Sequence, residues 1–159
     1  MEQIDPQVDL PVDPLTEFTG GNAALAEGRA GDAVAHYRRA VAAAPDVVEV
    51  HHNLAAALEK LQRWDEAAAV ARDGLARRPD YAPLHAVLGH LLSRADGEKH
   101  DDEQRQAARE HYEQALKLDG RMATAWSGLA GLLMAQESYE NALEKYHKAS
   151  QTNLVMLFA

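Results

Sequence analysis

Two stretches decide the fold of this chain: Tyr37-Arg-Arg-Ala-Val-Ala-Ala-Ala-Pro-Asp46 and Ala71-Arg-Asp-Gly-Leu-Ala-Arg-Arg-Pro-Asp80. Each is a helix-favouring segment followed by a proline, which cannot continue a helix. The two prolines, Pro45 and Pro79, are 34 residues apart. A period of roughly 20 to 50 residues is typical of proteins that repeat one supersecondary unit. The period therefore predicts a chain of stacked helix–turn–helix units.

Four such units fit the chain. They cover residues 14–47, 48–81, 82–122 and 123–156. The third unit carries a seven-residue insert, Asp96-Gly-Glu-Lys-His-Asp-Asp102, between its helices. Seven residues are close to two helical turns, so we expect both helices of this unit to lengthen by one turn.

The two ends differ from the repeated part. Residues 1–13 contain two prolines and three aspartates without a basic residue, which predicts an acidic, extended N-terminal arm. The chain closes on an apolar end, residues 157–159, preceded by further apolar residues. Helical arrays usually finish on a polar capping helix. Three explanations stay open: a longer protein, a tail that folds back, or a partner or second copy that covers this end.

Composition indicates an all-α protein and excludes several functions. Hydrophobic residues make up 47% of the chain but aromatic residues only 6%, so small side chains must fill the interior between closely packed helices. With a net charge of −9 and no basic stripe, we expect no nucleic-acid partner. Cysteine is absent, which excludes disulfides. No apolar run approaches the ~20 residues of a membrane span, and the start lacks a signal peptide, so we expect no membrane insertion and a cytoplasmic location.

Small residues recur at three places of every unit, where two helix backbones would approach closely. They are Gly21, Ala55, Gly89 and Ala130; Ala33, Ala67, Ala108 and Ala142; and Ala40, Gly74, Ala115 and Ala149. Large residues fill the places between them, among them Leu54, Leu88 and Tyr112. This pattern resembles the tetratricopeptide repeat family, with a composition that suggests a bacterial source. The resemblance implies a right-handed α-solenoid of about four repeats.

Repeat one departs from the family pattern in its first helix. Glu17 and Gly20 stand where the family has a large aromatic residue and a leucine. We therefore expect this helix to be poorly specified and to begin late.

The resemblance also implies a binding groove, because the first helices of successive repeats line the concave face of such arrays. The partner-binding residues predicted in this way are Leu15, Phe18, Asn22, Glu49, His52, Asn53, Ala56, Glu59, His90, Ser127 and Met134. Leu25, Pro83, Ala86, Ser93, Thr124 and Gly131 occupy further lining places. The ligand expected there is a peptide or a helix of another protein.

One subclass of the family binds the C-terminal carboxylate of heat-shock chaperones with two asparagines and three basic residues. Asn22 and Asn53 fall on the asparagine places, but the basic places hold Phe18, Pro83 and Val87. Because the charges that would neutralise a carboxylate are missing there, we expect the chain not to bind chaperone tails.

No motif for catalysis, a cofactor or a metal ion is present. Ser127 lacks the glycine-flanked turn of a nucleophile, and no phosphate-binding glycine loop occurs. The predicted function is a scaffold or adaptor that binds another protein, or a second copy, in the groove or by its end. The predicted docking residues at that end are Leu154, Val155, Met156, Leu157 and Phe158. The alternatives are a repeat module of a longer enzyme, such as a bacterial transferase, or an accessory or assembly subunit of an enzyme complex.

Overall fold

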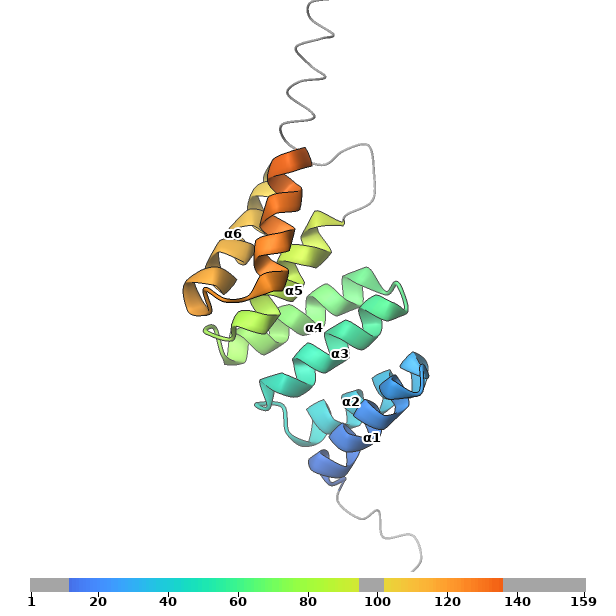
Figure 1. The fold of residues 1–159 in the computed structure, drawn as a ribbon. Helices are drawn as coiled ribbons and strands as arrows, with labels where there is room; N and C mark the ends of the chain where they lie inside the picture. The colour runs from blue at the N-terminus through green and yellow to red at the C-terminus, as the bar shows by residue number, and fades with distance from the viewer. Residues whose placement is uncertain (1–11, 95–101, 136–159) are drawn as a thin grey trace, which may run out of the picture.

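The computed structural model describes residues 12–94 and 102–135. This part of the chain contains helices and no strand (Figure 1). The helices are α1 (Pro14–Ala26), α2 (Ala30–Ala43), α3 (Val48–Lys60), α4 (Trp64–Arg77), α5 (Ala82–Ser93) and α6 (Asp102–Leu118). A further helical segment covers residues 123–135.

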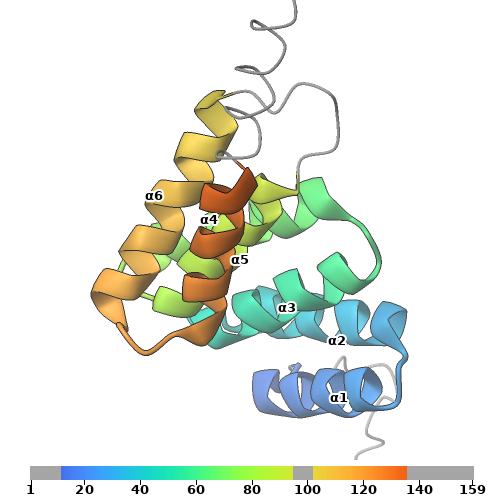
Figure 2. The ribbon, with the colours of Figure 1, turned by 45° about the horizontal axis from the view of Figure 1, so that its top comes forward.

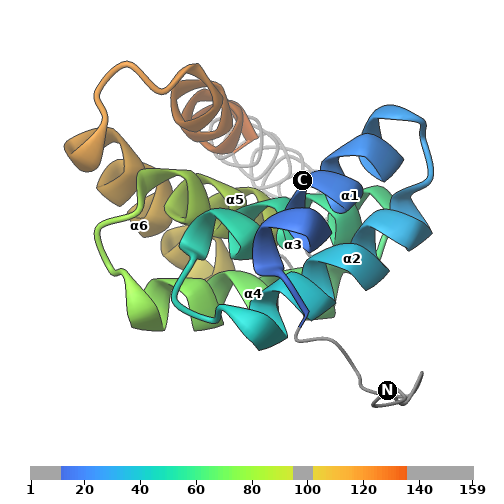
Figure 3. The ribbon, with the colours of Figure 1, turned by 90° about the horizontal axis from the view of Figure 1, so that it is seen from below.

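The helices form hairpins that stack one on the next. α1 packs on α2, α3 on α4 and α5 on α6, while α2 contacts α3 and α4 contacts α5 across the junctions. Viewed from below, α3 lies between α1 and α5 on one side of the array, and α2 and α4 lie on the other (Figure 3). The predicted all-α fold is confirmed as a helical repeat solenoid of about four repeats. Among the described helices, none is long and apolar enough to cross a lipid bilayer.

The first helix does not begin late, so that prediction is wrong. α1 begins at Pro14, and the carboxylate of Asp13 accepts hydrogen bonds from the backbone N–H groups of Leu15 (3.4 Å) and Thr16 (2.9 Å). An aspartate cap followed by proline at the first helical position is a strong start signal. Glu17, in the first turn, accepts from Arg39 of α2 at 2.9 Å and so ties the two helices together.

Repeat three lengthens in only one of its two helices. α6 has 17 residues against 14 in α2 and in α4, which is close to the extra turn expected. α5 has 12 residues against 13 in α1 and in α3, so the expectation for this helix is wrong. The guanidinium of its capping residue, Arg94, lies 4.7 Å from the centre of the Trp64 ring, and this cation–π contact fixes the chain at the end of the helix.

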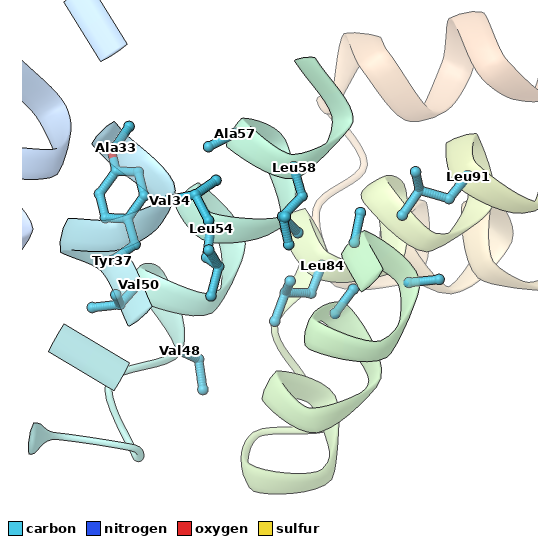
Figure 4. Packing of buried hydrophobic residues seen from close by; sticks show 14 of the residues in the cluster. Ala33, Val34, Tyr37, Val48, Val50, Leu54, Ala57, Leu58, Leu84 and Leu91 are labelled. Carbon is cyan, nitrogen blue, oxygen red and sulfur yellow. The ribbon is translucent and has the colours of Figure 1, made fainter. Parts of the chain in front are cut away.

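In the core, a large side chain of one helix packs directly on the backbone of a glycine in another helix. A Cβ atom added at Gly21 would lie 2.6 Å from Cδ1 of the buried Tyr37, and one at Gly74 would lie 2.5 Å from Cδ1 of Leu84. Leu84 joins α5 to the same core as Leu54 and Leu58 of α3 (Figure 4). Close packing of this kind leaves no room for another methyl group.

A second core joins α5, α6 and the segment 123–135, which lie together in Figure 2. Its centre is Tyr112, whose side chain is 2% exposed. The ring would collide with a Cβ atom at Gly89 of α5 and also with one at Gly128 of the helical segment. Gly89 was predicted as a close-contact residue, whereas Gly128 was not.

Replacing Gly21 by alanine should destabilise the chain by about 1–3 kcal/mol, because the new methyl group overlaps Tyr37 in a filled core. Gly31 is the matched control, since it is exposed in the first turn of α2 with nothing within 4 Å of its would-be Cβ. Gly31→Ala should raise stability by up to about 1 kcal/mol through helix propensity. Urea unfolding followed by circular dichroism measures both changes, and equal effects would contradict the packing argument.

Two histidines join α5 to α6 near the α4–α5 turn. Nε2 of His85 donates to the carbonyl oxygen of Pro79 at 2.8 Å, which leaves its Nδ1 to accept from Nδ1–H of His111 at 3.0 Å. Burial is the main cause that lowers the pKa of His111, and the positive charges of His85 and Arg72 lower it further, while Glu110 opposes them.

Acid should therefore destabilise the chain partly through His111. Because its pKa is lower in the folded than in the unfolded state, the unfolded chain binds more protons as the pH falls. The contribution is complete above the ordinary histidine value of about 6.5 and is lost as the pH falls through the folded value. The variant His111→Gln should lose less stability than the parent between about pH 7 and pH 5, measured by urea unfolding at each pH. Parallel curves for the two proteins would exclude this histidine as a cause.

Candidate functional site

A cavity of about 620 Å³ lies between α3, α5 and the helical segment 123–135. α3 and α5 are the first helices of two successive hairpins. Its lining residues are His52, Glu59, Pro83, Ala86, Val87, His90, Tyr112, Met122, Ala123, Thr124, Ser127 and Gly128. Small and apolar side chains predominate, and the polar groups are few, as is usual for binding sites.

The imidazole and carboxylate groups in the cavity come from α3 and α5, and the hydroxyl groups come from α6 and the segment 123–135. Nε2 of His90 lies 2.9 Å from Oε1 of Glu59, so the facing helices are bridged across the cavity wall. His52, about two helical turns before Glu59 in α3, also lines the cavity. The cavity is thus lined by apolar and polar side chains together.

An amide network continues from the cavity toward α1. Oδ1 of Asn22 accepts from the hydroxyl group of Tyr37 at 2.7 Å and from Nδ2 of Asn53 at 3.0 Å. Nδ1 of His52 lies 3.2 Å from Oδ1 of Asn53. Burial raises the pKa of Tyr37, so its hydroxyl group remains a donor. Because both contacts fall on the oxygen of Asn22, its amide group is oriented and its two N–H donors are left for other acceptors.

A charged cluster borders the same region on the α4–α5 turn. Nη2 of Arg78 donates to Oε1 of Glu49 at 2.6 Å, and the guanidinium lies 4.3 Å from the centre of the Tyr81 ring. The Tyr81 ring in turn meets His52 edge-on, with ring centres 6.3 Å apart. The hydrogen bond from Arg78 is the main cause that lowers the pKa of Glu49. The polar network therefore extends from α1 to the start of α5.

The structure brings some of the predicted groove residues together. His52, Glu59, His90 and Ser127 line the cavity. Asn22, Asn53 and Glu49 belong to the adjoining network. Three predicted residues lie elsewhere: Leu15 and Met134 are 66% and 69% exposed outside the cavity, and Phe18 packs on Tyr37 with ring centres 6.0 Å apart. Ala56 lies half-buried in α3 without lining the cavity.

Sequence reasoning missed part of the lining. Tyr112 was expected only as a packing residue, yet its ring forms part of the cavity wall. Gly128 admits that ring, and its position does not belong to the family's set of small places. Met122 and Ala123 come from the turn before the helical segment, which a comparison restricted to first-helix positions does not include.

Some of the predicted residues lie outside the part of the chain that the structure describes. The docking residues 154–158 and residues 96–101 of the insert are not among the described residues. Within residues 12–94 and 102–135, no three histidine, aspartate or glutamate side chains gather as metal ligands.

Comparison with known proteins gives one curated relative. The Hsp70-Hsp90 organizing protein of Triticum aestivum is 36% identical over 69 residues, which is 43% of this chain. The match spans only 12% of the relative's length, so the chain corresponds to a small part of that protein.

Solved structures with the same fold cover most of the chain. The first TPR of Spaghetti (RPAP3), bound to the HSP90 peptide SRMEEVD, has a TM-score of 0.71 and 20% identity over 80% of this chain and 98% of its own. The TPR2B domain of yeast Sti1, in a complex with pHsp70, has a TM-score of 0.67 and 16% identity over 77% of this chain and 97% of its own. At this level of identity the similarity establishes the fold.

These comparisons overturn one prediction, namely that chaperone tails are excluded as ligands. The argument was that Phe18, Pro83 and Val87 replace the three basic residues of the chaperone-binding subclass. Neighbours of the same fold are bound to HSP90 and HSP70 peptides, and the curated relative is by its name an organiser of both chaperones, so the exclusion of chaperone tails does not stand. The exclusion was wrong because it considered only three places and no other cation near the groove.

Two family models described as tetratricopeptide repeat match residues 24–91 and 101–152. Together they cover more than half of the sequence. The matched residues include α2, α3, α4 and α6 in full and nearly all of α5. This chain belongs to the tetratricopeptide repeat family.

Proposed function

We propose that this chain is an adaptor that binds an extended segment of another protein along α1, α3 and α5. The observation that carries the proposal is the amide network at Asn22. Its carbonyl oxygen accepts from Tyr37 and Asn53, and within residues 12–94 and 102–135 this leaves its two N–H donors available to a ligand. Oriented donors of this kind suit the carbonyl or carboxylate oxygens of a bound peptide.

The cavity supports the same function from the adjoining repeats. An extended peptide held by Asn22 and Asn53 would pass His52, which belongs both to the network and to the cavity lining. Beyond His52, the apolar lining formed by Ala86, Val87 and Tyr112 would take an uncharged side chain of the same peptide. Backbone and side chain would thus be bound by different repeats.

Acidic C-terminal peptides of heat-shock chaperones are the first ligand class to test. Proteins of the same fold carry such peptides in their solved complexes, and the two asparagines of this groove lie 3.0 Å apart in hydrogen-bond contact. We propose an adaptor role without catalysis, in the cytoplasm. The groove residues Leu15, Phe18, Ala56 and Met134 remain proposed contacts for parts of a ligand outside the cavity.

The variant Asn22→Asp tests this function. It keeps the carbonyl-like oxygen that Tyr37 and Asn53 require but removes both N–H donors. We expect about five- to tenfold weaker binding of the peptide SRMEEVD and of its carboxylate-free analogue SRMQQVN with an amidated end. Fluorescence anisotropy with labelled peptides measures both affinities.

Gln106→Glu is the matched control, because Gln106 is an exposed amide on α6 and its replacement adds the same charge. Its affinities should stay within twofold of the parent. The groove proposal fails if neither peptide binds the parent protein, or if Asn22→Asp binds both as the parent does.

A further inference from the structure

The guanidinium of Arg78 is incompletely satisfied. One nitrogen, Nη2, donates to Glu49 at 2.6 Å, and the plane rests on the Tyr81 ring. Its Nε atom is buried and has no hydrogen-bond partner among residues 12–94 and 102–135. Buried polar groups without a partner are rare, and each costs stability. This arrangement therefore leaves the donor capacity of the arginine partly unused.

The geometry of arginine indicates what would satisfy it. The guanidinium offers five N–H donors in a planar fork, and a carboxylate can accept two of them in parallel. Glu49 contacts only Nη2 and leaves Nε unpaired. An approaching carboxylate that took two donors would bind better than the internal one.

Glu49 is a weak competitor for such a ligand. Its side chain is 49% exposed and that of Arg78 is 42% exposed, so water screens the pair. Among the carboxylates of residues 12–94 and 102–135, only that of Glu49 lies within ion-pair distance of Arg78. Exchanging it for another carboxylate breaks one half-exposed ion pair and forms a second.

Arg78 also lies at the edge of the groove. Its ring partner Tyr81 meets His52, and His52 contacts Asn53, which is bonded to Asn22. A peptide bound along these groups would reach the guanidinium within a few residues. Arg78 comes from the α4–α5 turn, so it occupies none of the first-helix places from which a charge was expected.

We propose that Arg78 is the residue that selects acidic ligands in this groove, and that Glu49 occupies it when no ligand is bound. An acidic side chain or the terminal carboxylate of the peptide replaces Glu49 on the guanidinium. The inference rests on the proposed peptide-binding function and names the chemistry of its ligand. The exchange replaces one ion pair by another, and no proton is transferred and no covalent bond is formed or broken.

Opposite effects of two substitutions test the exchange. Arg78→Gln removes the cation and should weaken binding of SRMEEVD at least about tenfold. Glu49→Gln removes the competitor and should strengthen it about three- to tenfold. The carboxylate-free analogue should bind both variants as it binds the parent. A merely structural ion pair would give the same sign for both substitutions.

Arg109 and Glu113 on α6 provide matched controls for the change in net charge. They form a similar ion pair at 2.8 Å, with side chains 44% and 51% exposed, and belong to neither the cavity nor the network. Arg109→Gln and Glu113→Gln should change the affinity for SRMEEVD less than twofold. Thermal unfolding of all four variants identifies any that fail to fold. The conservative variant Arg78→Lys keeps a cation and should bind SRMEEVD more tightly than Arg78→Gln does.

The outcomes separate the two proposals. If Asn22→Asp weakens binding of the analogue but Arg78→Gln does not change the affinity for SRMEEVD, the acid-selection inference is wrong. The groove proposal then still stands. The inference is also overturned if Arg78→Gln and Arg109→Gln weaken binding equally, or if Glu49→Gln fails to strengthen it. If neither peptide binds the parent protein, the groove proposal fails as well.

Discussion

At two places the array depends on a tyrosine ring that presses against the backbone of a glycine in a neighbouring helix. Tyr37 lies on Gly21 within the first hairpin, and Tyr112 lies between Gly89 and Gly128 at the junction of the third and fourth repeats. Each ring fills the space that a β-carbon would otherwise take, so the helices come close enough to exclude water. Since a hairpin cannot bury its apolar surface alone, every such contact stabilises its neighbours too.

The same rings connect the core to the binding surface. The ring of Tyr37 is fully buried, but its hydroxyl group reaches Asn22 and sets the direction of that amide. Tyr112 is buried to nearly the same degree and still forms part of the cavity wall. A groove residue here is oriented by a packing residue behind it, which is how a surface made of short, flexible side chains becomes specific.

Much of the fold could be predicted from the sequence. Small residues that recur at one place of each repeat, such as Ala33, Ala67 and Ala108, indicate where two helix backbones lie close together. The start of α1 was misjudged since Glu17 looked like a missing core residue, whereas it forms an ion pair with Arg39 of α2. Position-by-position comparison found Asn22 and Asn53. It could not find Arg78, whose contact with Glu49 depends on how the α4–α5 turn folds back toward α3.

The hydrogen bond between Asn22 and Asn53 joins two different hairpins. A peptide that requires both amides can be held only while those hairpins are stacked in register, so binding and stacking are linked equilibria. The ligand would then protect the junction against local opening, and slow hydrogen exchange would extend from α1 into α3. In such an array a bound peptide would hold two neighbouring hairpins in a fixed orientation. Its affinity would then depend on the angle between those hairpins.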